Sequence, residues 1–221
     1  RNHSSAASDV YKRQVIWKNN NAKLGIISAG KSYNDVLEAF RWLGIDEEKA
    51  KSMGIALYKV GMPWPLEPQG IREFCRGLDT VLVVEEKREL IEHQVKWQLY
   101  NWKENVRPTV IGKQDENGKW LLPAENDLPM QTIIEVIAER ISKFNSDSAV
   151  INQLDWFQKR NKSQENINAP LNRKPFFCSG CPHNTSLMVP EGKRALGGIG
   201  CHYMAVNLSL IHISEPTRHR R

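Results

Sequence analysis

Between residues 23 and 145, short apolar runs alternate with stretches whose apolar residues recur at helical spacing. The runs typical of buried strands are 23–28, 54–60, 79–86 and 107–112, and the amphipathic stretches are 32–44, 66–77, 89–101 and 128–144. Such alternation is typical of a parallel sheet with helices on both faces. Four consecutive apolar residues within 79–86 suit a strand that is covered on both sides. The sequence therefore predicts an α/β fold with a Rossmann-like domain.

The segment from Gly25 to Ser32 matches the phosphate-loop pattern G-x4-G-K-[ST]. In such a loop the first glycine follows a strand, so that the next residues form a turn of free N–H groups. Here Gly25 begins the apolar run, and Ile26 and Ile27 continue it. We therefore interpret the segment as a strand, a tight turn at Gly30 and a helix, in preference to a nucleotide site. That turn lies at the carboxyl end of a strand, where ligands often bind.

Two further strand ends carry residues with more than one interpretation. Glu85 and Glu86 end the run 79–86. They are either functional carboxylates or, more commonly, part of a solvated surface and partners of the next helix dipole. Prolines at positions 63, 65 and 68 stiffen the loop after 54–60, which favours a rigid packing loop at least as much as ligand contact.

The two ends of the chain do not continue these patterns. Residues 1–14 and 208–221 resemble translated sequencing-adapter sequence, and we expect both to be non-native tails. Four of the six net positive charges lie in these tails. Because the interior is nearly neutral and has no stripe of lysine and arginine, we expect no nucleic-acid partner.

Composition also bears on the cellular compartment. No apolar run approaches the roughly 20 residues that a membrane-spanning helix needs, so we expect no membrane partner. No segment has the layout of a signal peptide. Four cysteines, two of them in one C-x-x-C motif, fit a reducing compartment with a metal or redox site. We therefore expect a cytoplasmic protein.

The regular pattern ends near residue 145. Residues 149–172 are predicted to be an interdomain linker, because this stretch is polar, with Asn, Ser, Lys and Pro prominent. This places an α/β domain at 15–148 and a second unit at 173–207. At 35 residues or fewer of native sequence, the second unit is too short to bury a core of its own.

The second unit contains three of the four cysteines. Cys178 and Cys181 are placed to chelate one metal from a tight turn at Gly180, and Cys201 follows a glycine-rich stretch. With His183 or His202 as a nitrogen ligand, a zinc site of three cysteines and one histidine is chemically sensible. A [4Fe–4S] site with its fourth cysteine beyond this chain is equally so. A dithiol redox pair and simple buried thiols remain open as alternatives. Cys75, in an amphipathic stretch, is predicted to be a buried apolar residue.

Four segments in order carry a family resemblance: LYKVGMPWPLEP, VLVVEEKRELIEHQ, FCSGCPHNTS and VPEGKRALGGIGCHYMA. Over about residues 23–207 the chain resembles the indolepyruvate:ferredoxin oxidoreductases, a group of the 2-oxoacid:ferredoxin oxidoreductases. The resemblance implies thiamine diphosphate with Mg2+, a 2-oxoacid substrate, coenzyme A as acyl acceptor, and [4Fe–4S] clusters that pass electrons to ferredoxin. It also implies a transketolase C-terminal-type domain, then the truncated start of a thiamine-diphosphate-binding domain, and a homo- or hetero-oligomeric parent enzyme.

The resemblance further implies roles for individual residues. Cys178, Cys181 and Cys201 match three thiolate ligands of the cluster. The resemblance also implies a cofactor pocket, and its candidate residues are Gly200, Cys201, His202, His183 and Asn184. No catalytic residue is assigned.

Several parts that the family requires are not found in this sequence. The Gly-Asp-Gly magnesium motif, the pyrimidine-binding domain and the fourth cluster cysteine are missing, so we expect this chain alone to be inactive. The alternative from another functional class is a non-enzymatic zinc-binding module attached to an α/β interaction domain. Which 2-oxoacid is used cannot be read from these residues.

Overall fold

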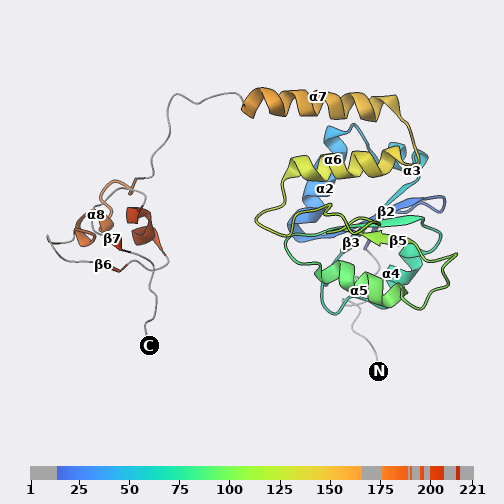
Figure 1. The fold of residues 1–221 in the computed structure, drawn as a ribbon, viewed down its shortest axis with the longest axis horizontal. Coiled ribbons are helices and arrows are strands. Elements are labelled where there is room, and N and C mark those ends of the chain that lie inside the picture. Colours follow the sequence, from blue (N-terminus) through green and yellow to red (C-terminus); the bar gives the residue numbers. More distant parts are fainter. Residues whose placement is uncertain are drawn as a thin grey trace. The chain divides into compact units, whose positions relative to one another are not determined.

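The structure is a computed structural model that describes residues 14–165, 176–188, 190, 195–196, 200–206 and 213–214 (Figure 1). The chain divides into two compact units, Arg1–Gln164 and Glu165–Arg221. Each unit is described separately below. No helix among the described residues is both long enough and apolar enough to cross a membrane.

The first unit is built on a five-stranded sheet with the order β1-β3-β2-β4-β5. The strands are β1 (Val15–Trp17), β2 (Leu24–Ala29), β3 (Ile55–Val60), β4 (Thr80–Val84) and β5 (Thr109–Ile111). β2 pairs in parallel with both β3 and β4, and β4 pairs in parallel with β5. The four strands and their parallel pairing confirm the α/β prediction. The edge strand β1 was not predicted, and it pairs antiparallel with β3.

Helices cover both faces of this sheet, as predicted (Figure 1). One face carries α2 (Gly30–Trp42) and α6 (Met130–Ser142), with α7 (Ser148–Glu165) packed outside them; α3 (Glu47–Ser52) lies near the end of that face. The other face carries α4 (Pro68–Cys75) and α5 (Leu90–Leu99). Because helices cover both faces, successive residues of a central strand face apolar helices on opposite sides of the sheet. This explains the run of four apolar residues in β4.

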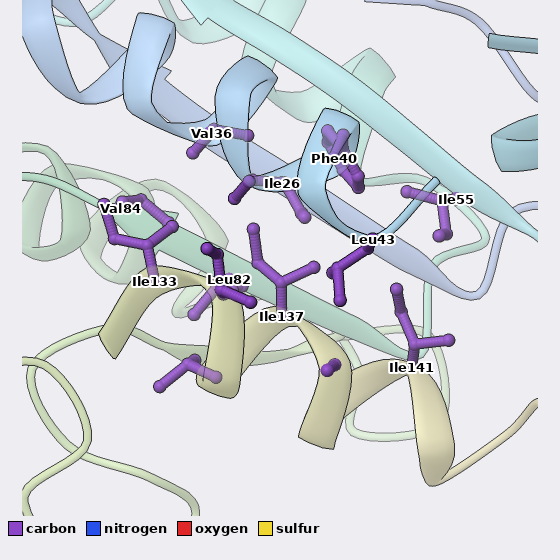
Figure 2. Packing of buried hydrophobic residues seen from close by; sticks show 14 of the residues in the cluster. Ile26, Val36, Phe40, Leu43, Ile55, Leu82, Val84, Ile133, Ile137 and Ile141 are labelled. Carbon is purple, nitrogen blue, oxygen red and sulfur yellow. The ribbon is translucent and has the colours of Figure 1, made fainter. Parts of the chain in front are cut away.

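The larger apolar core lies between the sheet and the pair α2 and α6. Figure 2 shows Ile26 and Leu82 of the sheet facing Phe40 of α2 and Ile137 of α6. All four side chains are at most 1% exposed. On α6 the buried residues Ile133, Ile134, Ile137 and Ile141 recur at helical spacing, so one face of the helix supplies the contact. This spacing is what made the helix predictable.

The smaller core lies beneath α4 and α5 and explains two residues of the sequence. Cys75 is fully buried there, as predicted, and burial raises the pKa of its thiol to about 12. Gly25 lies inside β2, where an added Cβ would overlap Leu78 Cδ1 and lie 2.9 Å from Phe74 Cε1. The glycine of the apparent phosphate loop is therefore needed for packing, and a loop of free N–H groups does not follow it, because β2 continues to Ala29.

The linker prediction for 149–172 is wrong over most of its length, because Ser148–Glu165 forms the helix α7. Residues 166–172 lie outside the described residues. The helix is anchored by Phe157, which is 7% exposed, and by Trp156, whose ring stacks on Trp42 at 5.8 Å. Val150 is also buried in the larger core, so α7 packs through a few apolar residues in a largely polar segment, and composition alone pointed away from a helix.

The boundary drawn after residue 14 is also corrected. Gln14 is 3% exposed, and its carbonyl oxygen accepts a hydrogen bond from the Lys59 N–H at 2.7 Å. Its side-chain oxygen accepts from the Gly61 N–H at 3.3 Å. Gln14 is thus part of the folded unit; residues 1–13 and 207–212 lie outside the described residues, as do 215–221, so the non-native character of both tails stays a prediction.

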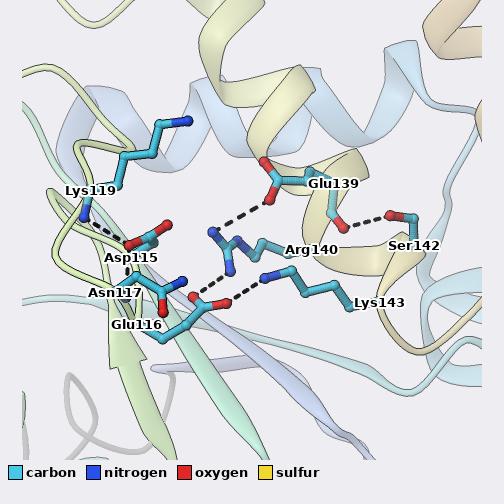
Figure 3. Close-up of polar contacts among 8 residues, drawn as sticks. All are labelled: Asp115, Glu116, Asn117, Lys119, Glu139, Arg140, Ser142 and Lys143. Atoms are coloured by element: carbon cyan, nitrogen blue, oxygen red, sulfur yellow. Dashed lines mark hydrogen bonds and ion pairs between the residues drawn. The ribbon is translucent and has the colours of Figure 1, made fainter.

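An ion-pair cluster fixes α6 to the turn that follows β5 (Figure 3). Glu116 accepts a hydrogen bond from Arg140 at 2.7 Å and pairs with Lys143. The hydrogen bond from Lys143, first, and the Arg140 guanidinium lower the pKa of Glu116 to about 2. The contribution of this carboxylate to stability is therefore present above its unfolded pKa of roughly 4.3 and is lost as the pH falls towards 2.

We expect Glu116→Gln to flatten the acid limb of the stability profile. Between pH 6 and pH 3, urea unfolding of the wild-type chain should show a larger loss of stability than the same measurement on Glu116→Gln. Glu125→Gln is the matched control, since the Glu125 side chain is exposed and forms no ion pair with the described residues. An unchanged pH dependence in Glu116→Gln would show that the ion pairs do not form in solution.

The second unit has little regular structure among its described residues. It contains the short helix α8 (His183–Ser186), the 3-10 helix η1 (Cys201–Val206), and the strands β6 (Ala195–Leu196) and β7 (Ile213–Ser214), which pair in parallel.

Candidate functional site

The C-x-x-C motif forms a tight turn in the second unit. The Cys181 N–H donates to the Cys178 carbonyl oxygen at 3.0 Å, and Gly180 has a φ of 72°. A residue with a side chain adopts this left-handed conformation only with strain, so the glycine is what closes the turn. Cys178 is exposed and Cys181 is half-buried, and both are free thiols. The turn thus brings two soft ligands to one end of α8.

His183 is the third donor at this turn. Its Nδ1 lies 3.1 Å from the Sγ of Cys181, and its ring stacks on Phe177 with 5.5 Å between the centroids. Asn184 follows on α8, with an exposed side chain and its N–H donated to the Cys181 carbonyl oxygen at 3.1 Å. The structure therefore brings Cys181 and His183 into contact, and it places Cys178 at the other end of the same C-x-x-C turn.

The remaining predicted residues lie on η1. Cys201 begins this helix and is exposed, and Gly200 precedes it. His202 follows, and its side chain lies outside the described ones. Across the described ranges, no group of three or more His, Cys, Asp or Glu side chains is close enough to hold a metal ion. Cys201 is thus not brought together with the C-x-x-C turn, and the donor set is thiol-rich but not closed.

A second cluster of functional groups lies at the carboxyl edge of the sheet, in the first unit. Gly30 opens α2 with a φ of 54°, which confirms the tight turn expected there. Beside it the Lys31 ammonium pairs with Asp35 at 2.7 Å and with Glu86 at 3.0 Å. These hydrogen bonds raise the pKa of Lys31. Both carboxylates hold the ammonium in place, so the lysine links the start of α2 to the end of β4.

Glu85 turns inward beside this pair and caps α5. Its carboxylate accepts the Ile91 N–H at 2.9 and 3.1 Å and the Glu92 N–H at 2.9 Å. Of the two interpretations given for this residue, the structure favours the partner of a helix N-terminus. Glu86, in contrast, is the surface carboxylate that pairs with Lys31.

Glu92 and Lys113 complete a buried ionic network that the sequence did not indicate. Glu92 accepts the Lys113 N–H at 2.8 Å and the Lys96 ammonium at 2.6 Å. The Lys113 ammonium donates to the carbonyl oxygens of Glu85 at 2.7 Å and Pro123 at 2.9 Å. The network therefore ties the ends of β4 and β5 to α5 and to the following loop.

Burial governs the charge state of this network. It raises the pKa of Glu85, although the N–H groups of Glu92 and Ile91 oppose the shift. It lowers the pKa of Lys113, although the carboxylates of Glu85 and Glu92 oppose that shift. Each buried group is thus moved towards its neutral form, and hydrogen bonds to the backbone keep it satisfied. The arrangement serves to hold strand ends in place, since it leaves no reactive group exposed.

We expect Glu85→Ala to destabilise the first unit by about 2 kcal/mol, because it leaves two buried N–H groups of α5 without an acceptor. Glu85→Gln keeps one acceptor oxygen and should lose roughly half as much. Urea unfolding of both variants measures this. Glu86→Ala is the neighbouring control, since it removes only a surface ion pair. If Glu85→Ala cost no more than Glu86→Ala, the capping role would be excluded.

The chain is similar in sequence to known proteins. A family model described as the indolepyruvate oxidoreductase domain matches residues 14–164. A curated protein of Pyrococcus horikoshii named indolepyruvate oxidoreductase subunit IorA is 35% identical over 192 residues, covering 84% of this chain and 26% of that protein. The protein of the same name from Thermococcus kodakarensis is 32% identical over 190 residues, with the same coverage of 84% and 26%.

Among solved structures, a split-gene transketolase in its inactive β4 tetramer aligns with a TM-score of 0.37 and 13% identity, covering 57% of this chain and 40% of that chain. The chain spans about a quarter of the length of the curated relatives given above. The family match begins at Gln14 and ends within α7, so it takes in the whole five-stranded sheet and its helices. On that match, the chain belongs to the indolepyruvate oxidoreductase family.

Proposed function

We propose that this chain is part of a 2-oxoacid:ferredoxin oxidoreductase that acts on indolepyruvate or a similar aryl-pyruvate. The observation that carries the proposal is the family match over 14–164. The proposed reaction is oxidative decarboxylation to an acyl-coenzyme A, with the electrons accepted by ferredoxin. The relatives are named as subunits, which supports an oligomeric assembly, and we propose a cytoplasmic location.

Within that enzyme we propose that the first unit is a scaffold. Its buried network of Glu85, Glu92 and Lys113 holds the carboxyl ends of β4 and β5, and Lys31 joins the start of α2 to the same edge. Ligands of open α/β sheets bind at this edge. The transketolase C-terminal-type assignment of this unit is supported by the order of the four resembling segments.

The second unit is proposed to carry the iron–sulfur and thiamine diphosphate contacts. Thiamine diphosphate, with Mg2+, supplies the carbon nucleophile for decarboxylation when bound. On this chain we propose Cys178, Cys181 and Cys201 as thiolate ligands of a [4Fe–4S] cluster. Gly200 and His202 beside Cys201, and His183 and Asn184 beside the C-x-x-C turn, are proposed pocket residues. The described residues do not close a cluster site, so no step of electron transfer is assigned to particular atoms.

The contact between Cys181 and His183 favours a second candidate function. A thiol and an imidazole 3.1 Å apart on a C-x-x-C turn are ligands that zinc accepts as readily as iron. On this alternative the second unit is a zinc-binding module of three cysteines and one histidine, and the chain takes no part in electron transfer.

Anaerobic reconstitution separates the two functions. The purified chain is incubated with iron, sulfide and reductant, or with zinc alone, and bound metal is measured after desalting. We expect iron and sulfide in equal amounts and an EPR signal of a reduced [4Fe–4S] cluster after dithionite treatment. One zinc per chain with no iron–sulfur signal would establish the zinc module and overturn the oxidoreductase assignment of these cysteines.

A further inference from the structure

A cavity of about 830 Å3 opens on the first unit, at the amino ends of β4 and β5 and thus at the edge opposite the buried network. One wall is the end of α4 and the turn into β4, and the other is the loop between α5 and β5. The charged and aromatic residues that line the cavity are Arg72, Arg76, Asp79, Trp102, Lys103 and Arg107. Neither the proposed enzyme function nor the family match gives this cavity a role.

Charge in the cavity is strongly positive. Four cationic side chains line it against one carboxylate, that of Asp79, which already pairs with Lys23 at 3.2 Å. The side chains of Arg76 and Lys103 make no hydrogen bond or ion pair with the part of the chain that the structure describes. Cations without partners around a concave surface repel one another, so an anion placed between them would be stabilised.

The two other cations are held in position by the backbone. Arg72 Nη2 donates to the Gln98 carbonyl oxygen at 3.4 Å, and Arg107 Nη1 donates to the Tyr100 carbonyl oxygen at 3.0 Å. Each guanidinium has five N–H donors in a planar fork, so one such bond orients the group and leaves others for a ligand. The forks suit phosphate oxygens, which they can bind in a bidentate way.

Backbone hydrogen bonds also make the walls rigid. The Asp79 N–H donates to the Lys23 carbonyl oxygen at 2.9 Å, and the Asp79 carbonyl oxygen accepts from the Thr109 N–H at 2.9 Å. In the opposite loop, the N–H groups of Val106 and Arg107 both donate to the Lys103 carbonyl oxygen at 3.0 Å. The backbone that carries these cations is therefore held in place, which lowers the conformational entropy lost when a ligand binds.

Trp102 adds a flat aromatic surface. Its indole packs against the smaller core and also lines the cavity. Stacking on such a ring contributes about 1–3 kcal/mol for a nucleobase, whichever base it is. An aromatic ring beside a group of guanidinium and ammonium ions is the complement of a planar base joined to phosphates.

We propose that this cavity binds a nucleoside diphosphate, with the base on Trp102 and the phosphates among Arg72, Arg76, Lys103 and Arg107. The cavity volume lies within the range of about 300–1,000 Å3 that is usual for small-molecule sites. An acidic protein surface is the competing occupant, and the aromatic ring of Trp102 beside the cations favours the nucleotide.

Calorimetric titration of the 221-residue chain with ADP tests the proposal, with adenosine and inorganic pyrophosphate as separate titrants. We expect saturable ADP binding that is tighter than the binding of either part. The double variant Arg76→Gln/Lys103→Gln should weaken ADP binding roughly 10- to 100-fold, because each change removes a charged hydrogen-bond donor. Circular dichroism and thermal unfolding check that the variant is folded.

Lys18→Gln/Lys159→Gln is the matched control, since it removes the same charge at exposed positions outside the cavity. This control should bind ADP within about twofold of wild type, a difference of less than half a kcal/mol. Equal weakening in both double variants would reduce the effect to net charge and overturn the proposal. Pyrophosphate binding as tight as ADP binding would overturn the nucleotide assignment, and so would the absence of saturable ADP binding.

Discussion

Gly112→Ala should destabilise the first unit by about 3 kcal/mol or more, because a new methyl group has no room there and a buried hydrogen bond is lost with it. An added Cβ would overlap Glu92 Oε2 and would lie 3.0 Å from the Val83 carbonyl oxygen. Glu92 cannot give way without losing the Lys113 N–H, which it accepts at 2.8 Å. The backbone of Val83 belongs to β4 and is equally fixed. Urea unfolding measures the loss as a lower midpoint.

Gly118→Ala is the control for this prediction. Gly118 has a φ of 80°, and an added Cβ there would have nothing within 4 Å, so only backbone strain of about 1–2 kcal/mol is expected. Comparison of the two variants separates steric overlap from the loss of glycine itself. If Gly112→Ala were no less stable than Gly118→Ala, the close packing of Glu92 on β5 would be wrong.

The central strands and main helices could be predicted because the spacing of their apolar residues matches the faces that they bury. In β4, Val81 and Val83 face the smaller core while Leu82 and Val84 face the larger one, so four consecutive positions are apolar. The apparent phosphate loop could also be interpreted correctly as a strand and a turn, from the position of Gly25 in the apolar run. Gly25 begins an apolar run, and the structure places it inside β2.

Elements that depend on long-range contacts could not be predicted in the same way. β1 is three residues long and depends on pairing with β3, which the local sequence does not encode. α7 packs on the larger core, and its Trp156 and Phe157 meet Trp42 on α2, more than a hundred residues earlier. Local composition is the only sequence signal for both elements, and tertiary contacts override the structure that it indicates.

The buried network shows the same limit for functional groups. Glu85 is a candidate from sequence because it follows a predicted strand. Whether its side chain points into the protein or to solvent depends on the N–H groups of α5. Glu92 lies between Ile91 and His93 on α5, and nothing in the local sequence indicates that its side chain is buried. Lys113 has no signal of its own, because its partners are carbonyl oxygens from two distant segments.

The predicted thiol ligands are open to the sharpest test. In the anaerobically reconstituted chain, Cys178→Ala, Cys181→Ala and Cys201→Ala should each lose nearly all bound iron, because a cubane cluster with two or fewer protein thiolates is not retained through desalting. Cys201 is the most informative of the three, since the described residues do not bring it to the C-x-x-C turn. Its loss of iron would show that the ligands come together when the cluster forms, as in other sites whose metal drives folding. Iron and labile sulfide per chain are the quantities to measure.

Cys75→Ala is the internal control for this series. Burial raises the pKa of the Cys75 thiol to about 12, so it is not the thiolate that a metal requires. This variant should keep its full iron content while losing about 1 kcal/mol of stability, since it removes one buried sulfur atom from the smaller core. Full iron retention in Cys201→Ala would remove that residue from the ligand set. It would leave the thiols of the C-x-x-C turn, with His183 Nδ1 3.1 Å from the Sγ of Cys181, as the iron ligands.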